Sequence, residues 1–298
     1  MLKQFWNETF LKEYRDNLVF EQFAMKGAAD KNSGTLVHWL SLADLSAAAA
    51  LSEGYDPTAY ALSAGDQTAT LTQYGATVLM SDLVKDTWIK GAMTNVIQRI
   101  SRNAAKTIDT VIRDAVFTAG GMVQYAGTAV ARNSIPFDST FYVDVPEVRE
   151  AVNSLEKANA TRFTDGYFAG VIHPDVKYDL QGDTTYWLAA HQYTDKGVEK
   201  VYKGEAGEMY GVKFIMTTDA LQMVNSGSAN ADVYQSYIVA DGFLGTSDLQ
   251  GLQIIVKDPL PSSTLNLTST VGWKATFATR ALKASGMVRL ESSSTFGA

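Results

Sequence analysis

Residues 81–121 read SDLVKDTWIKGAMTNVIQRISRNAAKTIDTVIRDAVFTAGG, and this stretch decides how the rest of the chain is arranged. Its apolar side chains recur three or four positions apart, which is the period of a helix with one buried stripe. The stripe comprises Ile89, Met93, Val96, Ile97, Ile100, Ala104, Ile108, Val111, Ile112 and Ala115. At 1.5 Å per residue a continuous helix here would be roughly 45–60 Å long, far longer than the usual ~11–12 residues.

The same stretch carries start and stop signals for the helix. Ser81 is suited to cap its N-terminus, and Gly120–Gly121 to end it. Gly91 is the weak point, where a short first turn is expected to break from the main rod. Asp109 and Arg113 are four residues apart and predict a surface ion pair. The face opposite the apolar stripe carries Lys90, Asn95, Arg99, Arg102, Lys106 and Arg113.

The amino-acid composition limits which kinds of protein this chain can be. The chain has 298 residues, of which 46% are hydrophobic, so it can bury a sizeable core in one large domain or two modest ones. Charged residues make up only 19%, which suggests that much of the surface contacts other protein. The net charge of −7 and the pI near 5.0 argue against a dedicated nucleic-acid-binding protein.

Cysteine usage and targeting signals narrow the class further. The absence of cysteine excludes disulfides, thiolate metal sites and cysteine nucleophiles. Residues 1–17 carry charges where a signal peptide has an apolar run, and no apolar run approaches the ~20 residues of a membrane-spanning helix. We therefore expect a soluble protein that is intracellular when made.

The first 80 residues predict extended and projecting structure. A helix is expected from Thr9 to Lys26, either packed on its own core or lying as an arm across a neighbouring subunit. Residues 35–42 read as a strand, and 51–80 as a long two-stranded hairpin without lysine or arginine, because turn residues separate alternating positions. A bare hairpin is marginal in water, so this one needs a surface to lie on.

The rest of the chain predicts an α+β fold, because helix and strand are segregated and do not alternate. A second helix is expected from Asp144 to near Asn159, with Val148, Val152 and Leu155 as its buried stripe. Strands are expected within residues 166–172, 203–218, 234–243, 252–259, 264–282 and 287–293.

A search for catalytic, cofactor-binding or metal-binding residues selects none, so we expect a protein that is not an enzyme and holds no cofactor. His38, His173 and His191 are not in metal-binding spacings; His173 reads as a structural turn residue and the other two as packing or surface residues. Residues 204–211, GEAGEMYG, match no nucleotide-binding loop and read as two turns around a hairpin. The carboxylates of Glu53, Asp56 and Asp66 are explained by solubility. The basic patch of Arg99, Arg102 and Lys106 leaves two interpretations open, contact with phosphate or salt bridges to a neighbouring chain.

Six segments in this order resemble the major capsid proteins of tailed bacteriophages, which have the Hong Kong 97-type fold. They are LSEGYDP (51–57), TQYGATVLMSDL (72–83), TIDTVIRDAVFTAGG (107–121), AGVIHPDVKYDL (169–180), GEAGEMYGVKFIMTTDA (204–220) and TVGWKATFATRAL (270–282). The resemblance covers nearly the whole chain, and the order of the segments is more specific than any one of them.

The resemblance implies a division of the chain into parts. Residues 1–50 would be an N-terminal arm, 51–80 an extended loop, 81–164 a peripheral domain with the spine helix, 165–258 an axial domain, and 259–298 a return to the peripheral domain. Some members of this fold link subunits covalently through an extended-loop lysine, and this chain has no lysine between Leu51 and Ser81.

The implied function is a coat protein, made in the host cytoplasm, that assembles as pentamers and hexamers into the icosahedral head of a tailed double-stranded DNA phage. The implied partners are further copies of the chain, scaffolding, portal and decoration proteins, and packaged DNA contacted without sequence specificity; no membrane is involved. Two alternatives remain, an encapsulin-type shell that encloses cargo enzymes and a stand-alone hydrolase or oxidoreductase.

Overall fold

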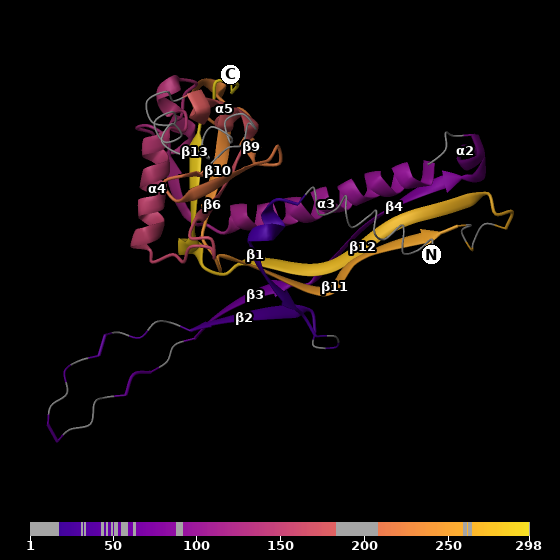
Figure 1. The fold of residues 1–298 in the computed structure, drawn as a ribbon, viewed down its shortest axis with the longest axis horizontal. Coiled ribbons are helices and arrows are strands. Elements are labelled where there is room, and N and C mark those ends of the chain that lie inside the picture. The colour runs from indigo at the N-terminus through magenta and orange to yellow at the C-terminus, as the bar shows by residue number, and fades with distance from the viewer. Residues whose placement is uncertain are drawn as a thin grey trace.

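The computed structural model describes residues 18–30, 34–42, 64–87, 92–182, 208–258 and 264–297, with a few single positions between them. Helix α3 (Ala92–Thr118) runs along one side of a long sheet, a lobe of strands and helices lies at its C-terminal end, and a hairpin projects from the opposite side (Figure 1). With 27 residues, α3 is about 40 Å long. A short helix, α2 (Asp82–Thr87), precedes it. The break expected at Gly91 falls on residues outside the described part of the chain.

The apolar stripe predicted for the long helix is confirmed over its described length. Six of its side chains are buried: Val96, Ile97, Ile100, Ala104, Ile108 and Ile112. They pack on a four-stranded sheet in the order β1-β11-β12-β4, in which β1 pairs parallel to β11 and the other pairs are antiparallel. These strands are β1 (Ala24–Ala28), β11 (Leu244–Lys257), β12 (Thr268–Ala281) and β4 (Thr72–Ser81). This helix-on-sheet layer forms the first core.

The lobe contains a second, mixed sheet in the order β5-β13-β10-β6-β8-β7, with β9 paired to β10. Its strands are β5 (Met122–Tyr125), β6 (Phe168–Ile172), β7 (Glu208–Met209), β8 (Val212–Met216), β9 (Gln222–Met223), β10 (Val233–Val239) and β13 (Met287–Ser292). Helices α4 (Val145–Lys157) and α5 (Pro174–Gly182) contribute side chains to the second core beside this sheet. Five 3₁₀ turns complete the described elements: η1 (Phe20–Phe23), η2 (Arg132–Ser134), η3 (Ser139–Phe141), η4 (Ser228–Asn230) and η5 (Ala284–Gly286). No helix in these described segments is both long and apolar enough to cross a membrane.

Helix α4 forms as its sequence predicts. The Asp144 side chain caps it by accepting a hydrogen bond from the N–H of Glu147 at 3.3 Å. Pro146 occupies the first turn, where the absent N–H has no intrahelical partner to lose. The stripe of Val148, Val152 and Leu155 is buried, and the helix ends at Lys157, two residues before the expected end.

The expected hairpin within residues 51–80 is wrong in its pairing. The two-stranded sheet joins β2 (Leu36–Leu42) to β3 (Ala64–Thr70), while β4 pairs with β12 over its whole length. Thr35 closes the base of the hairpin, since its carbonyl accepts a hydrogen bond from the N–H of Leu71 at 2.8 Å. The alternation in 64–80 therefore belongs to two strands that bend apart at Leu71 into different sheets (Figure 1).

The expected N-terminal helix is wrong at its C-terminal end. Residues 1–17 lie outside the described part of the chain, but Ala24–Ala28 form β1 instead of the last turn of a helix. The parallel ladder to β11, from Leu244 to Asp248, satisfies the main chain there. Pairing with a distant strand thus overrides the local apolar pattern.

The two cores cut across the expected domain bounds, which otherwise stay a prediction. Helix α4, expected with the spine helix, packs in the second core. Strand β11, expected in the axial domain, lies in the four-stranded sheet, and β13, expected in the return segment, lies in the second sheet. The reason is that β11 and β12 are 14-residue strands that span the length of the long layer and end at the lobe.

Two neighbouring positions of α3 test the assignment of its faces. Ile100 is 3% exposed, so Ile100→Asp is expected to bury an unpaired carboxylate and to cost several kcal/mol of unfolding free energy. Arg99 is exposed, and Arg99→Ala is expected to change that free energy by less than about 0.5 kcal/mol. Urea unfolding followed by circular dichroism measures both, and equal losses would show that the faces are wrongly assigned.

Candidate assembly surfaces

The histidines do not form a reactive site in the described part of the chain. His38 Nδ1 lies 2.8 Å from Asp66 Oδ2 across the β2–β3 hairpin, where both side chains are exposed. His173 caps α5, because its Nδ1 accepts a hydrogen bond from the N–H of Asp175 at 3.2 Å. Burial lowers the pKa of His173, although the Asp175 carboxylate, 3.2 Å from the same ring nitrogen, raises it in part. The expected turn role of His173 is confirmed, and His191 lies outside the described residues.

In the parts that the structure describes, the glycine-rich segment and the acidic residues also form no group suited to catalysis. Tyr210 and Gly211 both have positive φ angles and turn β7 into β8, as the hairpin interpretation of this segment expects. Within the described segments no three histidine, aspartate or glutamate side chains gather as a metal site.

Asp109 anchors the N-terminal segment to the spine helix. It lies on the buried side of α3 with 1% of its surface exposed. Its Oδ1 accepts hydrogen bonds from the N–H groups of Phe20 at 2.7 Å and Val19 at 3.1 Å. Phe20 is itself buried and packs edge-on against Tyr237, with ring centroids 6.3 Å apart. The segment that leads into β1 is therefore held at a fixed point of the helix.

The prediction of a surface ion pair between Asp109 and Arg113 is wrong. Arg113 instead pairs with Asp114 at 2.9 Å and donates a hydrogen bond to the main-chain oxygen of Asp219 at 3.0 Å. The sequence did carry a signal for the burial of Asp109. Asp109 comes four positions after Ala105 and three positions before Ile112, and both of these residues are fully buried. This spacing places Asp109 on the same helical face as the two buried residues.

A buried charge network fixes the lobe. Glu291 in β13 has no exposed surface and accepts two hydrogen bonds from Arg132, at 2.6 and 2.8 Å. Arg289 Nε lies 2.9 Å from the same carboxylate, and Gln235 donates to it at 3.0 Å. Tyr237 then donates to Gln235 at 2.7 Å. A buried carboxylate is tolerable only when it is paired with cations and hydrogen-bonded, so we interpret this network as structural.

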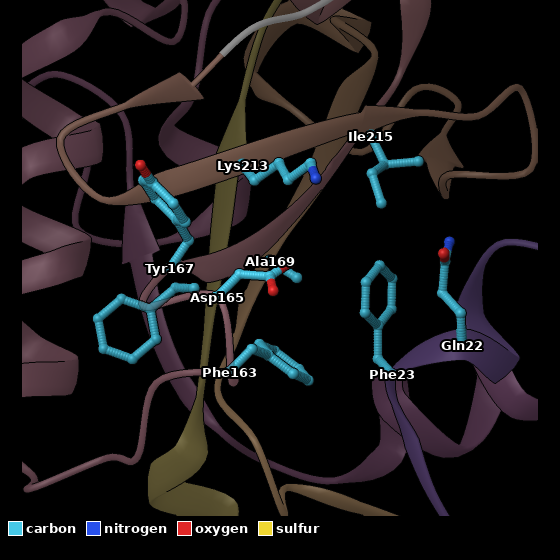
Figure 2. Close-up of a pocket in the computed structure, with 9 residues that line it drawn as sticks. Gln22, Phe23, Phe163, Asp165, Tyr167, Ala169, Lys213 and Ile215 are labelled. Atoms are coloured by element: carbon cyan, nitrogen blue, oxygen red, sulfur yellow. The ribbon is translucent and has the colours of Figure 1, made fainter.

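A cavity of about 190 Å³ lies between the N-terminal segment and the lobe. Figure 2 shows Gln22 and Phe23 on one side of it, facing Phe163 and the β8 residues Lys213 and Ile215. The rings of Phe23 and Phe163 are 6.1 Å apart. Four of the nine lining residues are aromatic, and none of the nine is a nucleophile hydrogen-bonded to a base, so we interpret the cavity as a packing gap at this junction.

The hairpin exposes apolar side chains and has no core of its own. Leu36 is 52% exposed and Leu40 72% exposed, although both lie in a paired strand. Midway along β2 the hairpin lies against the long sheet, since a Cβ placed on Gly245 would come within 3.0 Å of the Trp39 indole nitrogen. The hairpin thus meets the long sheet through the face that carries Trp39 and exposes Leu36 and Leu40 on the other face.

A second apolar patch, the distal patch, lies at the end of the long layer remote from the lobe. Its members lie at the end of β4, in the segment just before β12, and on α2, where the main-chain N–H of Asp82 donates a hydrogen bond to the Leu267 carbonyl (Figure 1). They are Leu79 (63% exposed), Leu83 (69%), Leu265 (75%) and Leu267 (47%). These four large apolar side chains are exposed at the same end of the layer, and such a surface is a candidate site of protein contact.

Comparisons with known proteins agree with the fold expected from the resemblance. No protein-family model matches the chain, and no curated protein matches it. The structure is similar to "Capsid structure of the Cyanophage P-SCSP1u", with a TM-score of 0.72 and 13% identity over 92% of this chain and 87% of that one. The chain has the fold of a phage capsid protein.

Two further capsids support this conclusion. The capsid of Ralstonia phage GP4 has a TM-score of 0.72 at 11% identity, covering 91% of this chain and 87% of that chain. The asymmetric unit of the cyanophage Pam1 capsid has a TM-score of 0.63 at 17% identity, covering 89% and 87%. The expected α+β capsid fold is confirmed, and the likeness extends over nearly the full length of these proteins.

The buried carboxylate of Asp109 gives stability a specific pH dependence. Burial raises the pKa of Asp109 from 3.8 to about 6, although the N–H groups of Phe20 and Val19 lower it in part. The folded state therefore binds this proton more tightly than the unfolded state does. The stabilisation is complete below the unfolded pKa and is lost as pH rises through the folded pKa.

Asp109→Asn keeps the acceptor oxygen but cannot ionise. Relative to the variant, the wild type is expected to lose on the order of 2 kcal/mol of unfolding free energy between about pH 4 and pH 7. Urea unfolding at several pH values measures the difference, with the exposed Asp165→Asn as the control. A difference that stays constant over this range would contradict the assignment.

Proposed function

We propose that the chain is a major capsid protein that assembles as pentamers and hexamers into the icosahedral head of a tailed double-stranded DNA phage. The observation that carries the proposal is the capsid fold, matched over 87% or more of both chains in the two structures with a TM-score of 0.72. The bare hairpin and the distal patch support it, because both leave apolar surface that only another protein can cover.

The proposed assembly joins unlike surfaces. A hairpin on one subunit and an apolar patch elsewhere make heterologous contacts, which generate rings when the rotation closes. In this proposal β2 and β3 carry the extended loop, α3 with the four-stranded sheet forms the peripheral domain, and the lobe forms the axial domain. The role is structural and not enzymatic, and the protein resides in the virion after synthesis in the host cytoplasm.

Further partners belong to the same proposal. Scaffolding and portal proteins would guide assembly, a decoration protein could cover the outside, and packaged DNA would be contacted without sequence specificity. The low pI supports weak contact, since few phosphates can be neutralised by an acidic chain.

An encapsulin-type shell is the alternative. It is favoured by one likeness, to a virus-like particle from Pyrococcus furiosus, with a TM-score of 0.54 at 11% identity over 95% of this chain and 96% of that one. That TM-score is lower than those of the two capsids above. Negative-stain microscopy of the expressed protein tests for shells, and the nucleic acid content of particles made during phage infection separates the two kinds of shell.

The hairpin is expected to be required for assembly and dispensable for the subunit fold. Thr35 and Leu71 are joined by a hydrogen bond, so a short Gly-Ser turn can replace Leu36–Thr70. The shortened protein should unfold near the wild-type temperature but form no particles in the microscope. Val130→Ser, at an 85% exposed position in the lobe, is the control and should assemble. Particles of ordinary shape from the shortened protein would contradict this role.

The shell is expected to be held without covalent links. An isopeptide bond needs a lysine amine in the extended loop, and neither Leu36–Thr70 nor Leu51–Ser81 contains a lysine. Cysteine is absent as well, so disulfides cannot form. Large protein interfaces can be stable without either bond. Mature particles boiled in detergent should run as one band near 32.3 kDa, and a ladder of multimers would overturn this expectation.

A further inference from the structure

The exposed face of α3 is the part of the spine that carries positive charge. Arg99, Arg102 and Lys106 are all exposed, and residues 92–108 contain no carboxylate. The next acidic residue of the helix, Asp109, points into the core. A chain with a net charge of −7 therefore keeps a short basic row, here called the spine row, on one face of its longest helix.

The geometry of the spine row suits a regular line of negative charge. Positions 99, 102 and 106 follow the i, i+3, i+7 spacing of one helical face. Along the axis they span roughly 10 Å at 1.5 Å per residue. Phosphates of one DNA strand advance about 3.4 Å per step, so the row covers about three of them.

A groove in the same surface supplies further donors. It has a volume of about 250 Å³ and is lined by Asn95, Val96, Gln98, Arg99 and Arg102. Guanidinium groups and carboxamides both donate hydrogen bonds, and phosphate oxygens accept them. Such contacts position a protein on DNA without reading its sequence.

Two acidic side chains form ion pairs with basic residues of this helix. Lys106 Nζ lies 4.0 Å from the Asp219 carboxylate, and Asp114 is paired with Arg113. Both acids lie toward the C-terminal end of the helix. Within the described part of the chain, no ion pair involves Arg99.

We propose that the spine row binds the phosphate backbone of double-stranded DNA, and hence that this face of α3 lines the interior of the shell. The proposal rests on the coat-protein function above. A carboxylate surface on a neighbouring copy is the competing partner, but isolated surface ion pairs contribute only about 0–1 kcal/mol each. DNA offers one charge per about 1.7 Å of duplex and releases counterions on binding. Each copy would bind DNA only weakly through its spine row. Because the row is repeated in many copies, the interior of the shell would hold DNA loosely.

The test compares two double variants that lose the same charge. Arg99→Gln with Lys106→Gln removes two members of the spine row, and Lys157→Gln with Lys283→Gln removes two exposed cations elsewhere. Binding of the full chain to a random-sequence duplex is measured by fluorescence anisotropy over a range of salt concentrations. We expect the slope of log K against log salt to fall by about 2 in the spine-row variant and to stay at the wild-type value in the control.

Equal slopes in the two variants, or no binding by the wild type, would overturn the proposal. Microscopy of the wild-type protein is scored separately. Absence of particles would overturn the coat function, whereas particles with unequal slopes would support both conclusions. Particles with equal slopes would overturn only the role of the spine row.

The absence of native cysteine allows a second test, of orientation. Asn95→Cys places one thiol at an exposed position in the groove. In assembled particles a small maleimide should label it, while a polyethylene glycol maleimide too large to enter the shell should not. Labelling by both would place the face outside, and labelling by neither would place it between copies; either result would overturn the proposal.

Discussion

Strand β10 is buried at all seven positions, and the two cores of the molecule share it. Side chains alternate along a strand, so Tyr237 and Val239 enter the core beneath α3 while Tyr234 and Ile238 enter the core of the lobe. Its main chain is paired on both sides, with β13 and β6. A slip of one residue would exchange the two faces and place Gln235, which belongs to the Glu291 network, on the wrong side. The position of the long helix relative to the lobe depends on this strand.

Helices α3 and α4 could be predicted because their information is local. A period of three or four and a cap such as Asp144 lie within a few residues of the structure that they specify. The hairpin could not be predicted in the same way. Strands β3 and β4 are separated by Leu71 alone and share one alternating pattern, yet they join different sheets. The partner of β3 lies upstream at 36–42, and the partner of β4 lies near the end of the chain. Alternation shows that a strand forms but not which strand it meets.

The sequence predicted what kind of candidate assembly surface the protein has, but not where each surface lies. A hairpin without lysine, arginine or a core was expected from composition. The distal patch was not, because only the pairing of β4 with β12 places the segment before β12, with Leu265 and Leu267, beside the start of α2. The buried acids show the same limit. Asp109 was predicted to pair with Arg113, four residues later. Its partners are instead main-chain N–H groups 89 and 90 positions earlier. Glu291 meets Arg132 across 159 positions. The spacing of residues in the sequence shows which polar groups will be buried and need hydrogen-bond partners. The tertiary structure determines which residues those partners are.

The two faces of the long helix α3 have different roles, and the helical period assigns each residue to one face or the other. Side chains that point into the sheet, such as Ile97 and Ile112, determine whether a subunit folds, because their removal from water drives the packing of the layer. Side chains on the other face, such as Arg99, are exposed and do not take part in that packing. Since the two sets interleave every three or four residues along one rigid rod, the charge of the exposed face can change without altering the shape of the subunit. The shape of the subunit and the charge of this exposed helix face can therefore vary independently in this fold.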